Sequence, residues 1–134
     1  MPYLNYSYHA DGEAPEVSTG MIFVFGSNLA GRHGAGAALL AHEKFGAVLG
    51  RGSGPMGKSY GIPTKDKNLR RLGLAEIKIH AYNFMVYAEA HPKARFFITR
   101  VGCGLAGYKN EQIAPLFKFA PINCNFPYEW KQYL

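Results

Sequence analysis

The chain carries the same local pattern twice: a short apolar run, a glycine-rich loop and a segment that favours a helix. The first copy places an apolar run over Met21–Phe25 and a helix over Ala35–Phe45. The second places a β-prone run over Arg95–Val101 and a helix from about Asn110 to Phe119. Strands and helices that alternate in this way predict a largely parallel sheet with helices packed on it.

The rest of the chain fits the same architecture. A short strand is predicted over Ser59–Pro63, and apolar residues at helical spacing predict a helix over Leu74–Ala90. The stretch Gly50–Gly57 is expected to be a loop, and residues 1–20 an edge strand or an arm. We therefore predict an α/β fold, a three-layer α/β/α sandwich with a mixed, largely parallel sheet, in a single domain over residues 1–134.

Composition narrows the classes of partner. The formal net charge of +6 draws anionic molecules toward the chain. Two cysteines, Cys103 and Cys124, and apolar runs too short for a membrane span predict a reduced, cytoplasmic protein without a disulfide. No residue pattern predicts a metal or a cofactor, and the oligomeric state stays open.

Two glycine motifs match phosphate-binding patterns. Gly52–Ser59 satisfies the P-loop pattern letter for letter, but Gly61 and Pro63 follow at the point where that motif opens a helix. We interpret this match as coincidence. Gly102–Gly107 satisfies G-x-G-x-x-G after a predicted strand, yet the acidic residue expected about 20 positions later is absent.

The second motif keeps its physical meaning without that acidic residue. Glycines let backbone amides approach a phosphate, and a helix that begins at Asn110 adds partial positive charge. The alternative is a tight turn that packs a strand on a helix.

The first loop has more polar side chains. The apolar run is expected to end at Gly26, so that Asn28 lies in the loop and either bonds a ribose hydroxyl or caps a turn. His33 is expected to be an exposed loop histidine, and the glycines at 34 and 36 are expected to wrap a diphosphate.

Together the loops resemble those of the macrodomain superfamily, in particular its terminal ADP-ribose protein glycohydrolase branch. The resemblance covers Ile22 to about Leu116 and is carried by Gly34-Ala35-Gly36 before an alanine-rich helix, Lys44-Phe45-Gly46, Ile62-Pro63-Thr64-Lys65 and Val101-Gly102-Cys103-Gly104-Leu105. It implies a three-layer α/β/α fold, ADP-ribose or a derivative as ligand, no metal, and removal of ADP-ribose from modified molecules.

The resemblance also implies a site. It gives Lys65 the role of an amine nucleophile toward the ribose, whereas Ala106 replaces the aspartate that assists in that branch. Asp66 is a poor substitute, because neighbouring residues on an extended chain point to opposite faces. The aspartate that many macrodomains use for the adenine amine has no clear counterpart. The implied ligand-binding residues are Gly26, Ser27, Asn28, Gly34, Ala35, Gly36, Thr64, Gly102, Cys103, Gly104, Leu105, Ala106, Gly107 and Tyr108.

Three of these residues have plainer interpretations. Lys65 fits an ordinary solvated lysine, and Cys103 fits a small thiol packed under the loop rather than a nucleophile. Tyr108 either stacks on a base or ribose or seals the core.

Three functions follow as hypotheses. The first is a protein that binds ADP-ribose or a related nucleotide and hydrolyses a glycosidic or phosphate bond of an ADP-ribosyl derivative, on a protein or a nucleic acid. The second is a non-catalytic sensor or sequestering protein for a nucleotide signal, which Ala106 favours. The third is a basic nucleic-acid-binding module, which the net charge suggests.

Overall fold

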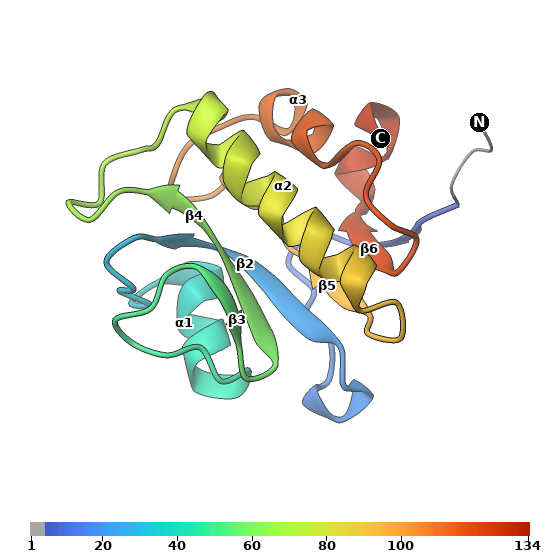
Figure 1. The fold of residues 1–134 in the computed structure, drawn as a ribbon, viewed down its shortest axis with the longest axis horizontal. Coiled ribbons are helices and arrows are strands. Elements are labelled where there is room, and N and C mark those ends of the chain that lie inside the picture. Colours follow the sequence, from blue (N-terminus) through green and yellow to red (C-terminus); the bar gives the residue numbers. More distant parts are fainter. Residues whose placement is uncertain (1–4) are drawn as a thin grey trace.

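A computed structural model describes residues 5–134 (Figure 1). It contains one six-stranded sheet in the order β1-β6-β5-β2-β4-β3. The neighbouring strands are parallel except for β3, which pairs antiparallel with β4. In chain order the strands are β1 (Ser7–His9), β2 (Ile22–Asn28), β3 (Gly54–Met56), β4 (Ser59–Lys65), β5 (Phe96–Ile98) and β6 (Cys124–Pro127).

Helices form the other two layers. The α-helices are α1 (Gly36–Lys44), α2 (Leu74–Ala90) and α3 (Asn110–Ile113), and 3₁₀ helices cover Val17–Thr19, Ala114–Phe117 and Tyr128–Tyr133. In Figure 1, α2 runs across one face of the sheet, and α3 and the C-terminal turns lie on the same side. Helix α1 packs on the opposite face. The predicted three-layer α/β fold with a mixed, largely parallel sheet is confirmed.

Alternation along β2 builds both cores. Val24 faces α2 and belongs to the larger cluster with Phe84 and Trp130, whereas Phe23 and Phe25 pack with the residues of α1. Successive side chains of a strand point to opposite faces, so one strand buries both of its sides. The predicted helix over Leu74–Ala90 is confirmed at both ends.

The strand predicted over the apolar run Met21–Phe25 is β2, and it is longer than predicted. It continues through Gly26, and Ser27 and Asn28 pair with β4 on either side of a bulge, so these residues are not in a loop. A Cβ at Gly26 would lie 3.3 Å from the backbone nitrogen of Gly102. The glycine therefore permits close packing against the second loop and does not end the strand.

The stretch Gly50–Gly57 was wrongly expected to be loop throughout. Its second half is β3, which forms a tight antiparallel hairpin with β4 across the turn at Gly57. The P-loop match accordingly lies on a hairpin and opens no helix, as predicted. A Cβ on Gly52 would lie 1.7 Å from the carbonyl oxygen of Asn28, so the backbone reaches β2 only because this residue is glycine.

Two further boundaries differ. The strand β5 covers Phe96–Ile98 only, since the chain turns at Thr99, whose carbonyl accepts the amide of Val101 at 2.7 Å. Helix α3 ends at Ile113, and a 3₁₀ helix with Pro115 in its first turn follows it. Proline has no N–H to donate the next α-helical hydrogen bond. The predicted helix to Phe119 is therefore wrong in its second half.

Residues 1–20 were expected to form an edge strand or an arm, and this segment contains the edge strand β1. Within the described residues, β1 pairs in parallel with β6. Because β2 runs in the same direction as β1, the chain between them returns along the sheet from the carboxyl ends of the strands to their amino ends. The part of that prediction over residues 1–4 lies outside the described residues. Across residues 5–134 no helix has the length and apolarity to span a membrane.

Candidate functional site

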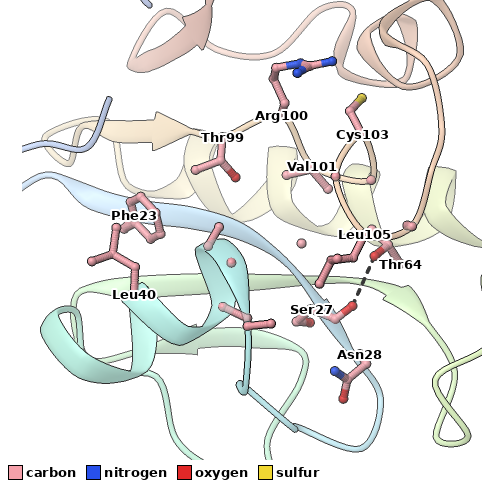
Figure 2. Close-up of a pocket in the computed structure, with 18 of the residues that line it drawn as sticks. Phe23, Ser27, Asn28, Leu40, Thr64, Thr99, Arg100, Val101, Cys103 and Leu105 are labelled. Atoms are coloured by element: carbon pink, nitrogen blue, oxygen red, sulfur yellow. Dashed lines mark hydrogen bonds between the residues drawn. The ribbon is translucent and has the colours of Figure 1, made fainter. Parts of the chain in front are cut away.

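A cavity of about 800 Å³ opens at the carboxyl ends of β2, β4 and β5, beside the N-terminus of α1 (Figure 2). In open α/β sheets this is where ligands bind, and the volume lies in the range of about 300–1,000 Å³ that small-molecule sites occupy. Both glycine-rich loops line it, although they are about 70 residues apart in the chain. The sequence therefore predicted correctly that the two loops meet at one edge of the sheet.

Most of the predicted site residues line this cavity. Lys65 and the following ligand-binding candidates lie on its wall: Gly26, Ser27, Asn28, Gly34, Ala35, Gly36, Thr64, Gly102, Cys103, Gly104, Leu105 and Ala106. Gly107 and Tyr108 are not part of the lining. Tyr108 is buried, donates its hydroxyl to the carbonyl of Leu72 and lies under the guanidinium of Arg71, 4.1 Å from the ring centroid. It seals the core rather than facing a ligand.

Three consecutive backbone amides in each loop have no acceptor within the described residues. At the start of α1, no side chain caps the helix, and the amides of Gly34, Ala35 and Gly36 donate to no group within residues 5–134. The same holds for Gly104 and Leu105 in the second loop, and for Ala106. Unpaired amides at a helix N-terminus, where the helix dipole adds partial positive charge, attract anions.

The polar side chains at the carboxyl ends of β2 and β4 serve a different purpose. The side-chain amide of Asn28 donates from Nδ2 to the carbonyl of Arg32 at 2.8 Å and accepts the backbone N–H of Arg32 on Oδ1 at 2.9 Å. This pair of bonds closes the turn after β2. The Ser27 hydroxyl donates to the carbonyl of Gly52, and the Thr64 hydroxyl donates to the carbonyl of Ser27 at 3.2 Å (Figure 2). These residues shape the loops and leave the backbone to face the cavity.

His33 is buried, not exposed as the sequence suggested. Its side chain is 1% exposed, and its Nε2 lies 2.9 Å from the carbonyl oxygens of both Val48 and Arg51. The ring also meets Phe25 edge-on. His33 thereby joins the loop after β2 to the loop that precedes β3, and it does not line the cavity.

Lys65 ends β4 at one side of the cavity, where it is half-buried. The neighbouring carboxylate of Asp66 accepts the amides of Asn68 and Arg70 at 2.8 and 2.9 Å, and Asp66 does not line the cavity. The expectation that Asp66 is a poor partner for Lys65 agrees with this geometry.

Sequence reasoning missed the N-terminal segment and Arg100. His9, Asp11 and Glu13 line the cavity, and no local pattern predicted this, because only tertiary packing brings them there. Arg100 donates from Nη1 to Asp11 at 3.0 Å and from Nε to Asn110 at 2.9 Å. Its position directly before a glycine-rich loop was a signal that could have found it.

Apart from Arg32 and Thr99, the remaining lining is apolar or glycine. In Figure 2, Phe23 and Leu40 lie at one end of the lining, and Asn28 and Thr64 lie at the other. Within residues 5–134, no cluster of three or more histidine, cysteine, aspartate or glutamate side chains has a geometry that could hold a metal ion.

The Cys103 thiol, half-buried in the cavity wall, is held in its neutral form. Burial raises its pKa from 9.0 to about 11, and the opposing effect of Arg100 is smaller. We expect iodoacetamide at pH 8 to alkylate Cys103 about 100-fold more slowly than in the unfolded chain, because a rise of two pKa units lowers the thiolate fraction by that factor. Mass spectrometry of the alkylated peptide over time measures this rate. Fast labelling of the folded protein at pH 7 would contradict it.

The fold and cavity define a class: three-layer α/β domains with a ligand-sized cavity at the carboxyl ends of their central strands. No family model and no curated protein matches the chain. It is similar to a solved structure described as "Structure of a Protein of Unknown Function from Bacteroides thetaiotaomicron," with a TM-score of 0.59, 18% sequence identity, and coverage of 94% of this chain and 99% of that chain. At this identity the likeness shows a shared fold.

Proposed function

We propose that the chain binds ADP-ribose or a related nucleotide, with the diphosphate between the two rows of free amides. The supporting observation is that Gly34–Gly36 and Gly104–Ala106 line one cavity while their amides donate to no group in the described chain. A diphosphate offers acceptors to both rows at once, and a water-excluding cavity strengthens such contacts. The resemblance to macrodomains agrees with this assignment.

Calorimetric titration with ADP-ribose, its phosphorylated form, NAD and AMP tests the proposal. ADP-ribose should bind more tightly than AMP, which lacks the diphosphate and the second ribose. The affinity should also vary little between low and moderate salt, because the diphosphate is bound mainly by uncharged amides. A nucleic-acid-binding module would instead prefer oligonucleotides and lose affinity steeply with salt, as counterion release requires. That outcome would contradict the proposal.

If the protein turns its ligand over, Lys65 is the group positioned to attack. It ends β4 and lines the same cavity as the free amides of the second loop. We propose that its amine forms a bond to the anomeric carbon of the distal ribose as the bond to the modified group breaks, and that the departing group takes the proton which the nitrogen loses. Water then hydrolyses the adduct and releases ADP-ribose and Lys65.

Lys65→Ala should then lower the release of ADP-ribose from a mono-ADP-ribosylated substrate by about 100-fold or more, since the nucleophile is lost, with affinity for free ADP-ribose nearly unchanged. Chromatography of the released nucleotide measures the rate. Lys67→Ala, an exposed lysine outside the cavity lining, is the matched control and should hydrolyse normally. Unchanged release by Lys65→Ala would rule out this mechanism.

A non-catalytic sensor is the second candidate, and a specific observation favours it. Ala106 supplies no acid or base, and the carboxylate next to Lys65 in the chain, that of Asp66, is bonded to two backbone amides and does not line the cavity. A sensor would return bound ADP-ribosyl ligands unchanged. Recovery of the ligand after calorimetry, followed by chromatography, therefore separates a sensor from a hydrolase.

A further inference from the structure

The cavity extends well beyond the diphosphate-sized space between the loops. Lys65 ends β4 and His9 ends β1, and β6, β5 and β2 lie between these two strands. Four strand spacings of about 4.8 Å separate β1 from β4, or about 19 Å across the sheet. Both residues line the same cavity, so it is long enough for a ligand with different groups at its two ends.

The end near His9 is built from rings and small apolar groups. The His9 ring stacks on Phe97 with a centroid distance of 3.7 Å and an angle of 19°, and Phe97 stacks in turn on Phe23. Phe23, Leu40 and Ala14 complete this wall of the cavity. A flat, weakly solvated group such as a nucleobase suits such a wall better than a charged phosphate does.

Hydrogen bonds fix which nitrogen of His9 carries the proton. The side chain of Asn125 donates from Nδ2 to the hydroxyl of Ser7 at 2.8 Å, which leaves its Oδ1 to face Nδ1 of His9. An amide oxygen accepts only, so Nδ1 carries the hydrogen and Nε2 keeps a lone pair. Burial lowers the pKa of His9 below 6.5, although Glu13, Glu129 and Asp11 oppose this effect, so the ring is neutral at pH 7.

The lone pair on Nε2 is free. This atom makes no hydrogen bond within residues 5–134, and it is not among the buried side-chain atoms that lack a partner, so it is accessible. Of the nearby carboxylates, Asp11 pairs with Arg100 and Glu13 accepts the amide of Ala10 at 2.8 Å. Nε2 of His9 is an acceptor with no partner in the described residues, on the ring that lies in this wall of the cavity.

We propose that His9 selects the base of the bound nucleotide, by accepting at Nε2 a hydrogen bond from an amino group on the base edge. The inference rests on the proposed function and goes beyond it. It places the base at the β1 end of the cavity and the distal ribose at the Lys65 end. An aminopurine satisfies the lone pair of His9, and a purine without the amino group leaves it unpaired.

The test compares ADP-ribose with its analogue that has hydrogen in place of the 6-amino group, by calorimetry at pH 7.5. The unmodified protein should bind ADP-ribose about 3- to 10-fold more tightly, the effect of one hydrogen bond between neutral groups. His9→Phe keeps a ring on Phe97 and removes the acceptor, so it should bind the two ligands alike. His91→Phe is the matched control, since His91 stacks on Tyr87 outside the cavity, and it should keep the preference.

The outcomes separate the inference from the proposed function. If the unmodified protein binds both ligands equally, or if His9→Phe keeps the preference, His9 does not select the base, while nucleotide binding stands. If the unmodified protein binds neither ligand, both proposals fail. The comparison within the unmodified protein decides the question even if His9→Phe does not fold.

Discussion

Gly104→Val should leave the fold intact and weaken ADP-ribose binding by about 100-fold, or about 2.7 kcal/mol of binding free energy. An added Cβ at Gly104 meets no atom within 4 Å, and the residue does not adopt a positive φ, so valine fits the free protein. Gly104 lines the cavity, on the same loop as the free amides of Leu105 and Ala106. The added methyl groups would hold a diphosphate away from those amides. Calorimetry measures the affinity, and thermal denaturation verifies the fold.

Gly73→Val provides the comparison. Gly73 precedes α2 with an extended backbone, φ −70° and ψ 159°, and it lies outside the cavity lining. This variant should bind ADP-ribose as the unmodified protein does. Equal affinity in Gly104→Val and Gly73→Val would mean that the ligand does not approach the second loop.

Gly52→Ala should lower the free energy of unfolding by about 3 kcal/mol or more, among the larger effects of a single added methyl group. The new Cβ would lie 1.7 Å from the carbonyl oxygen of Asn28 and 3.3 Å from the Cα of Leu29. Both obstacles are backbone atoms of β2 and its following loop, so the hairpin would have to move away as a unit. Urea denaturation followed by circular dichroism measures the loss.

Gly34→Ala is the control for this effect. A Cβ there has no neighbour within 4 Å, so stability should change by less than about 0.5 kcal/mol. If Gly52→Ala proves as stable as Gly34→Ala, the close approach of the hairpin to β2 is not a feature of the folded protein.

Local patterns predicted the architecture because each strand and helix that builds it has a strong period of its own. The helix over Leu74–Ala90 was predicted to the residue, and the meeting of the two loops followed from the rule that parallel strands end at one edge. Glycine misled the prediction twice. Gly26, and Gly52 and Gly57 on either side of β3, looked like breaks, whereas they allow backbones to pack closely.

The two loops of the site could be predicted from the sequence, but the part of the cavity wall formed by the end of β1 and the residues after it could not. Gly34–Gly36 and Gly102–Ala106 follow strands, so their place at the sheet edge could be inferred. His9 and Asp11 reach the cavity only because β1 pairs with β6, which lies about 115 residues later in the chain. No local signal encodes such a long-range pairing. The burial of His33 has the same origin, since its acceptors belong to another loop.

The free amides at the two loops have an evolutionary consequence. Every residue type except proline supplies a main-chain N–H, so substitution of a neighbouring side chain does not remove the donor. What must be inherited is the path of the backbone, which depends on small residues at a few points of contact such as Gly26 and Gly52. Distant descendants could therefore differ at most positions and still present the same donors to an anion.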